Sequence, residues 1–72
     1  MAESLDLRGI RCPVSWAKAK IRLEALPRDA ALELIVDDPK GARDIPRAAE
    51  AEGYAVAGVD QRHTEWRILI YK

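Results

Sequence analysis

Four short stretches of the chain have patterns that predict β-strands. Apolar and polar residues alternate in residues 4–8 and 30–36, and a period of two is typical of a strand with one buried face. Two β-like runs follow in residues 54–59 and 64–71, with Asp-Gln-Arg-His at positions 60–63 between them. These four polar residues predict a hairpin turn that joins the last two strands.

The first helix is predicted between two prolines. Pro13 suits the first helical position, because the N–H that proline lacks would have no partner there. Pro27 ends the helix near Leu26, because the residue before a proline is pushed out of the α region. Gly9 begins the turn of residues 9–11, where its freedom to adopt a positive φ helps the chain pass from the first strand into the helix.

A second helix is expected to begin at Asp44, as the N-cap, with Pro46 in its first turn, and to run to about Glu52. Residues 37–41, Asp-Asp-Pro-Lys-Gly, are interpreted as a turn or short helical shoulder, and Gly53 as the left-handed cap. The order β-α-β-α-β-β predicts an α+β fold, a two-layer α/β sandwich with two helices on one face of a four-stranded mixed sheet. We expect all 72 residues to form a single domain.

The first helix carries apolar residues on two sides, although the sheet can cover only one of them. One stripe comprises Trp16, Ala19, Leu23 and Leu26, and the other comprises Val14, Ala17, Ile21 and Ala25. We expect the bulkier stripe, with Trp16, to face the sheet. The other stripe is either covered by the second helix or exposed, and an exposed stripe would form a small docking surface beside residue 12.

Composition and charge limit the classes of function. A chain of 72 residues has little room for a deep catalytic pocket. Twelve Lys and Arg balance twelve Asp and Glu, which disfavours binding to nucleic acid or a membrane surface by bulk electrostatics. No stretch resembles a signal peptide or approaches the ~18 apolar residues of a membrane span. We therefore expect a soluble, cytoplasmic monomer.

Cys12 is the single cysteine of the chain. One thiol excludes an internal disulfide, a CxxC redox pair and a cysteine-rich zinc site, and we expect neither a metal nor a cofactor. At the start of the predicted helix, unpaired N–H groups and the helix dipole would stabilise a thiolate or a persulfide. Residues 1–28 are net basic, whereas residues 29–60 are net acidic, and Arg8 and Arg11 are candidate electrostatic supports for the thiol. The alternative interpretation is that Cys12 is a small buried hydrophobe.

His63 is the single histidine, and the predicted hairpin turn places it far from Cys12 in the sequence. A Cys-His dyad would therefore depend on tertiary contacts that the sequence does not indicate. We expect His63 to be an inert surface residue.

Residues 5–13, Leu-Asp-Leu-Arg-Gly-Ile-Arg-Cys-Pro, resemble the L-D-x-x-G-x-x-C-P element of the TusA/SirA-like family of small sulfur-carrier proteins. Asp-Asp-Pro at 37–39, Asp-Ile-Pro at 44–46 and then Gly53 resemble the second block of that family. The family fold is a two-layer β-α-β-α-β-β sandwich, in agreement with the pattern above. One position departs from the family pattern, since the family usually has C-P-x-P and this chain has Ser15 at the second proline. A serine is compatible with a helix start, where its hydroxyl can form local hydrogen bonds.

The resemblance implies that Cys12 accepts a sulfane sulfur as a persulfide from a cysteine desulfurase or a rhodanese-type donor. Cys12 would then pass this sulfur to a thiol of an acceptor protein, and related proteins feed tRNA thiolation, molybdenum-cofactor assembly or sulfur oxidation. Gly9 and Pro13 would shape the loop and the helix start around Cys12, with Arg8 and Arg11 as supporting residues. A single thiol suits this role, because a second cysteine could attack the persulfide and release sulfide.

Two other classes of function remain open. One is a regulatory or adaptor module on the same fold, in which Cys12 has no chemical role. The other is an RNA-binding domain, which the zero net charge and the absence of a basic and aromatic stripe disfavour.

Overall fold

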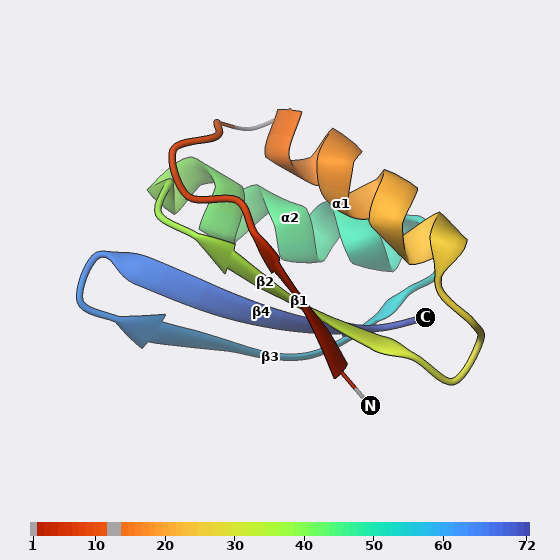
Figure 1. The fold of residues 1–72 in the computed structure, drawn as a ribbon. Helices are drawn as coiled ribbons and strands as arrows, with labels where there is room; N and C mark the ends of the chain where they lie inside the picture. The colour runs from red at the N-terminus through yellow and green to blue at the C-terminus, as the bar shows by residue number, and fades with distance from the viewer. Residues whose placement is uncertain (1, 12–13) are drawn as a thin grey trace.

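The computed structural model describes residues 2–11 and 14–72 (Figure 1). Its elements are β1 (Ala2–Asp6), α1 (Val14–Ala25), β2 (Ala31–Val36), α2 (Pro39–Ala51), β3 (Ala55–Arg62) and β4 (Glu65–Tyr71). Both helices cover the same face of the sheet (Figure 1). The predicted α+β sandwich and its β-α-β-α-β-β order are confirmed.

The sheet is mixed, and its strand order is β1-β2-β4-β3. β1 and β2 are parallel, whereas β4 is antiparallel to both of its neighbours, β2 and β3. A connection between parallel strands must cross back over the sheet, and α1 provides it between β1 and β2. α2 makes a similar crossover from β2 to β3, so the two helices run in the same direction and begin at the same end of the molecule (Figure 1).

The core lies between the sheet and the two helices. The alternation in β2 is confirmed, because Leu32, Leu34 and Val36 are fully buried. β4 contributes Ile68 and Ile70 beside them. The helices complete the core with Ala19 and Leu23 from α1 and Ala42, Ile45 and Ala49 from α2.

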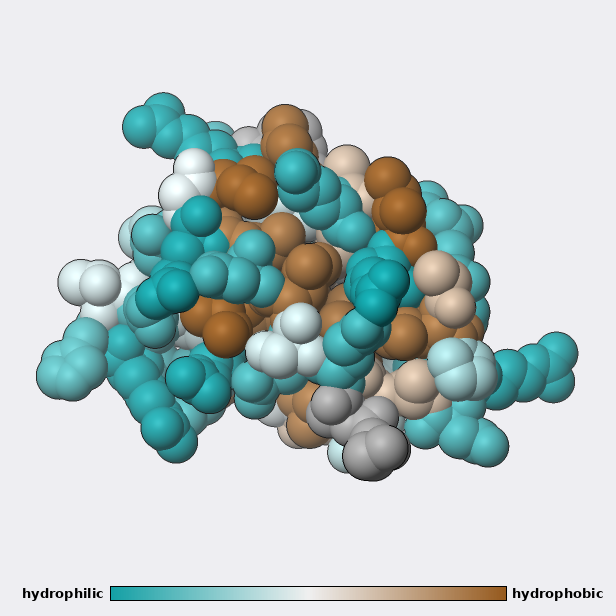
Figure 2. Space-filling view, in the orientation of Figure 1, coloured by the Kyte–Doolittle hydropathy of each residue, from teal (hydrophilic) through white to brown (hydrophobic). Residues whose placement is uncertain are grey.

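The orientation predicted for α1 is confirmed by the burial of its two apolar stripes. Leu23 is fully buried, and Trp16 is partly buried against the core, where its ring meets that of Tyr54 edge to face at 6.5 Å between centroids. The other stripe is not covered by α2, since residues Val14 and Ile21 are 53% and 68% exposed. Figure 2 shows apolar side chains among hydrophilic ones along the upper edge of the molecule, where α1 lies in Figure 1.

The predicted start of the second helix is wrong, because α2 begins at Pro39 and not after Asp44. Asp38 is the N-cap, and its carboxylate accepts a hydrogen bond from the backbone N–H of Lys40 at 3.1 Å. An aspartate followed closely by a proline occurs at both places, and the earlier pair starts the helix. Pro46 consequently lies inside the helix, where a proline costs about 3 kcal/mol relative to alanine.

The predicted hairpin turn is also too long. β3 continues to Arg62, and the turn consists of His63 and Thr64, with φ of 56° at His63. β3 is one of the two edge strands of the sheet, and its polar residues 60–62 are exposed although they belong to the strand.

The limits of two other elements are shifted relative to the predictions. β1 covers Ala2–Asp6 rather than residues 4–8, although the N–H of Leu7 still donates to the carbonyl of Ile35 at 2.8 Å. α1 ends at Ala25, one residue before the predicted end. The predicted left-handed cap after α2 is confirmed by the φ of 92° at Gly53.

Candidate functional site

The candidate site lies at the end of the molecule where both helices begin. Cys12 and Pro13 themselves lie outside the described residues, and the site is defined by the loop that precedes them in the sequence and by the starts of α1 and α2. The N–H of Ser15 donates to the carbonyl of Arg11 at 3.1 Å, a bond of α-helical spacing that connects the loop to α1. Because α1 and α2 run in the same direction, the positive ends of both helix dipoles lie at this end (Figure 1). Each dipole stabilises a nearby exposed anion by about 0.3–1 kcal/mol.

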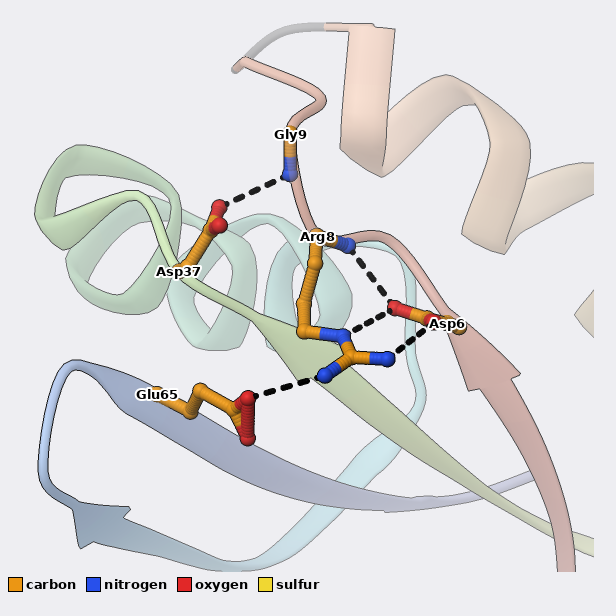
Figure 3. Close-up of polar contacts among 5 residues, drawn as sticks. All are labelled: Asp6, Arg8, Gly9, Asp37 and Glu65. Carbon is orange, nitrogen blue, oxygen red and sulfur yellow. Dashed lines mark hydrogen bonds and ion pairs between the residues drawn. The ribbon is translucent and has the colours of Figure 1, made fainter.

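Gly9 holds the loop against the end of β2. Its N–H donates to Oδ1 of Asp37, directly after β2, at 2.9 Å (Figure 3). Gly9 has φ of 81°, and no atom lies within 4 Å of the position that a Cβ would take. The backbone conformation, and not lack of space, is therefore what favours glycine here.

The guanidinium of Arg8 forms ion pairs with two carboxylates. Its Nε and Nη2 donate to Oδ1 and Oδ2 of Asp6 at 2.9 and 2.8 Å, and its Nη1 donates to Oε2 of Glu65 at 3.1 Å (Figure 3). Hydrogen bonds from the Arg8 side chain, and then from its backbone N–H, lower the pKa of Asp6 to about 2. The same partners raise the pKa of the Arg8 guanidinium. These contacts connect the loop to β4, so Arg8 acts on the shape of the loop.

Two further basic side chains of the first segment are also in ion pairs. Lys20 donates to Oε1 of Glu52 at 3.0 Å, and Arg22 donates to both carboxylate oxygens of Glu3. These bonds raise the pKa values of Lys20 and Arg22 and lower that of Glu3. Three of the six basic side chains of residues 1–28 are therefore ion-paired in the folded chain, two of them with acidic residues outside this segment, Glu52 and Glu65.

Arg11 is exposed and borders a shallow hollow next to the start of α2. The other residues that line the hollow are Gly9, Ile10, Asp37, Asp38 and Pro39. Arg11 therefore shares this hollow with Asp38 and Pro39 at the start of α2, whereas Arg8 does not line it.

The chain matches the model of the family described as Sulfurtransferase TusA over residues 3–72. It belongs to the TusA family. A protein of Archaeoglobus fulgidus, named as a candidate sulfur carrier protein, is 39% identical over 71 residues, which cover 97% of this chain and 81% of that protein. A protein of Methanocaldococcus jannaschii with the same description is 36% identical over 70 residues, which cover 97% of this chain and 93% of that protein.

The fold of this TusA-family chain also occurs in a solved structure. The crystal structure of a SirA-like protein from Desulfitobacterium hafniense superimposes with a TM-score of 0.81 at 22% sequence identity. The match covers 97% of this chain and 95% of that one. At this level of identity the likeness concerns the fold.

Ser15 is a residue of the TusA-family site whose surroundings the sequence does not reveal. Its side chain is fully buried, and Oγ has no hydrogen-bond partner among the residues that the structure describes. An unsatisfied buried hydroxyl costs about 1–3 kcal/mol. Oγ lies 3.6 Å from the position that a Cβ would take at Gly41, in the first turn of α2. The spacing from Cys12 is visible in the sequence, whereas the contact with Gly41 is not.

The remaining predicted features have no visible role at the site. His63 lies in the turn between β3 and β4, at the same end of the sheet as Glu65, but its side chain is exposed. Within residues 2–11 and 14–72, no group of three or more potential metal ligands is arranged to hold a metal ion. None of the helices in these ranges has the length and apolar content to span a membrane.

Proposed function

We propose that this protein is a sulfur carrier that accepts a sulfane sulfur as a persulfide on Cys12 and transfers it to a thiol of an acceptor protein. The observation that carries the proposal is the match to the TusA sulfurtransferase family over residues 3–72, with the single cysteine of the chain at the cysteine of the family motif. The descriptions of the archaeal relatives as candidate sulfur carriers support the same role. The proposal includes action as a single domain, as a monomer, in the cytoplasm.

The chemistry needs one thiolate and no bound cofactor. The Cys12 thiolate attacks the outer sulfur of a donor persulfide, R–S–SH. The S–S bond of the donor breaks, its electron pair leaves with the inner sulfur as the thiolate R–S⁻, and a new S–S bond forms to Sγ of Cys12. An acceptor thiolate removes the outer sulfur by the same displacement, so neither step requires an external oxidant or reductant.

The charge pattern at the helix starts supports an anionic sulfur. The positive ends of the α1 and α2 dipoles favour a thiolate or a persulfide anion over its protonated form. Arg11 adds an exposed guanidinium beside the α2 start, whereas the guanidinium of Arg8 is occupied by Asp6 and Glu65. Pro13 and Gly9 fit this scheme as residues that define the chain path on either side of Arg11.

The exposed stripe of α1 supports docking of the donor and acceptor proteins. Val14 follows Cys12 by two positions, and the stripe continues along the helix to Ile21. An apolar surface next to the transferable sulfur suits short-lived protein contacts. A cysteine desulfurase or a rhodanese-type protein is the proposed donor. The identity of the acceptor protein determines whether the sulfur enters tRNA thiolation, molybdenum-cofactor assembly or sulfur oxidation.

The proposal is tested by loading the protein and recording its intact mass. After incubation with a cysteine desulfurase, cysteine and pyridoxal phosphate, we expect a gain of one sulfur atom that a reductant removes. The matched control is Cys12→Ser, which should gain none. Failure to load from either a desulfurase or a rhodanese-type donor would overturn the proposal, and full activity of Cys12→Ser in cells would favour an adaptor role instead.

A further inference from the structure

The outer edge of β3 has no partner strand in the described part of the chain. The strand order is β1-β2-β4-β3, so β3 borders the sheet on the side opposite β1 (Figure 1). An unpaired edge offers backbone N–H and C=O groups to another strand, and proteins commonly block it with a short strand, charges, proline or a bulge. The edge formed by β1 is blocked in this way, since β1 has five residues and two of them, Glu3 and Asp6, are held in ion pairs.

β3 is less protected than β1. It is the longest strand of the sheet, with eight residues, and it contains neither a proline nor a lysine. Its register with β4 shifts between Val56 and Gly58, and this bulge interrupts the first part of the strand. From Gly58 to Arg62 the pairing with β4 is regular, and every residue is exposed. This regular segment is the part of the edge that can accept another strand.

The hairpin turn determines which backbone groups of this segment point outward. The residues that flank a two-residue turn form a hydrogen-bonded pair, and Arg62 and Glu65 have these places. Hydrogen-bonded and non-hydrogen-bonded pairs alternate along an antiparallel ladder, so Arg62 and Asp60 direct their backbone groups toward β4. The N–H and C=O groups of Val59 and Gln61 therefore point away from the sheet.

Asp60 and Arg62 give this segment its charge pattern. They lie on the same face, as residues two apart in a strand do, and their side chains are 62% and 69% exposed. They form an ion pair with each other at 3.0 Å. A guanidinium has five N–H donors and a carboxylate has two acceptor oxygens, so each side chain can bind a second opposite charge. The same segment of a second copy, running antiparallel, carries both of the charges that are needed.

The charges select one register for two antiparallel copies. The outward-pointing residues of the regular segment must meet, so the twofold axis passes through Val59, Asp60 or Gln61. An axis at Val59 places the bulge of one copy against the regular segment of the other. An axis at Asp60 places the two aspartates directly opposite each other, which is destabilising. An axis at Gln61 places Asp60 of each copy opposite Arg62 of the other, in a non-hydrogen-bonded pair, where side chains lie closest.

We infer that two copies of this protein pair through the outer edges of β3, antiparallel and with Gln61 at the twofold axis, and so join two sheets into one of eight strands. The backbone of Gln61 exchanges two hydrogen bonds with its counterpart, and Asp60 and Arg62 form two ion pairs between the copies. The contact is short and its ion pairs are exposed, so the dimer is weak and the monomer predominates in dilute solution.

This dimer goes beyond the proposed sulfur-carrier function and does not depend on it. α1 packs on β2, in the half of the sheet away from β3. Pairing of the β3 edges therefore leaves the exposed stripe of α1 free for other proteins.

The test is analytical ultracentrifugation of charge-reversal variants. The mass of the wild type should rise reversibly as its concentration approaches about 1 mM. Asp60→Arg and Arg62→Asp each place like charges opposite one another, so each variant alone should dimerise about tenfold more weakly, or less. An equimolar mixture of the two should associate again, because opposite charges then meet between the chains, although the ion pair within each chain stays broken.

The matched control is the double variant Asp60→Arg/Arg62→Asp, which keeps the net charge of the wild type. It should dimerise within about twofold of the wild type, and this result separates paired charges from bulk attraction in the mixture. A wild type whose mass does not rise up to about 1 mM would overturn the inference. Dimerisation of the single variants at the strength of the wild type, or a double variant as weak as they are, would overturn it too.

Discussion

The two ends of α1 differ in how their polar groups are paired. At the C-terminal end, the ammonium group of Lys72 donates to the backbone carbonyls of Glu24 and Leu26 at 3.0 and 2.6 Å. The carbonyl of Glu24 belongs to the last turn of α1, and that of Leu26 follows directly after the helix end, where backbone groups lack intrahelical partners. At the N-terminal end, the hydroxyl of Ser15 is buried without a partner in the described part of the chain. Hydrogen bonds from Lys72 thus satisfy backbone carbonyls at the C-terminal end of α1, which is the end remote from Cys12 in the sequence. At the N-terminal end, shortly after Cys12 in the sequence, the Ser15 hydroxyl can still form hydrogen bonds.

The largest expected effect comes from the two glycines with positive φ, one at each end of the helix layer. Gly9 has φ of 81° in the loop before Cys12, and Gly53 has φ of 92° after α2. Alanine at either position should lower the free energy of unfolding by about 1–2 kcal/mol, because side chains disfavour this region. Chemical denaturation measures this loss. Only Gly9→Ala should also slow persulfide loading, because only Gly9 belongs to the loop that Asp37 holds.

Gly58→Ala is the control for both glycine variants. Gly58 lies in β3, has no positive φ, and no atom lies within 4 Å of its Cβ position. This variant should unfold within about 0.5 kcal/mol of the wild type. Equal loading by Gly9→Ala and Gly53→Ala would contradict the assignment of the loop to the site.

A smaller effect, with opposite signs at the two ends of α1, is expected from removing single polar groups. Ser15→Ala removes an unpaired buried hydroxyl and should raise the free energy of unfolding by about 1 kcal/mol. Lys72→Met removes a helix-end partner of two carbonyls and should lower it by about 0.5–1 kcal/mol. Both changes are read from denaturation midpoints. A lower free energy of unfolding in Ser15→Ala would show that the hydroxyl has a partner in the folded protein. Slower persulfide loading in Lys72→Met would contradict the interpretation that the C-terminal end of α1 has no part in the site.

Much of the fold follows from patterns that are local in the sequence. The burial of Leu32, Leu34 and Val36 follows from a period of two, and the orientation of α1 follows from the bulk of Trp16 and Leu23. The start of α2 cannot be predicted from a local pattern, because Asp38 and Asp44 are each followed closely by a proline and both satisfy the local rules for a helix start. The earlier start adds a turn that buries Gly41 and Ala42, and that gain depends on tertiary packing.

For the candidate site, too, one part can be predicted from the sequence and another part cannot. Cys12 and the glycine of its loop are visible as a motif, and the spacing of Ser15 from Cys12 is visible too. The contacts of the site residues are not visible in the sequence. Arg8 contacts Glu65, which lies 57 positions away, and Ser15 meets Gly41 through the packing of α1 on α2. The basic segment in the sequence predicts free positive charge around the thiol, whereas the fold holds three of its six basic side chains in ion pairs.

The smallest expected effect concerns the ion pairs that fix the loop at the Cys12 end. Arg8 holds the pKa of Asp6 at about 2, compared with 3.8 for an ordinary aspartate. The lowered pKa means that this contact stabilises the folded chain above pH 4 and that its contribution is lost as the pH falls from about 4 to about 2. In Arg8→Gln the pKa of Asp6, followed by NMR of the side-chain carboxyl, should return toward 3.8. The difference in melting temperature between wild type and variant should then disappear within that pH range.

The matched control for this last prediction is Arg62→Gln. Arg62 forms an exposed ion pair with Asp60 at 3.0 Å in β3, two positions away in the chain, as Arg8 does with Asp6. Because Asp6 keeps its partner in this variant, its titration should remain at about 2. An Asp6 titration near 2 in Arg8→Gln would mean that other groups hold the carboxylate ionised and that Arg8 is dispensable for the loop. Loading at wild-type rate in Arg8→Gln, together with a restored Asp6 pKa, would separate the electrostatics of the loop from the sulfur chemistry and leave the helix starts as the main source of thiolate stabilisation.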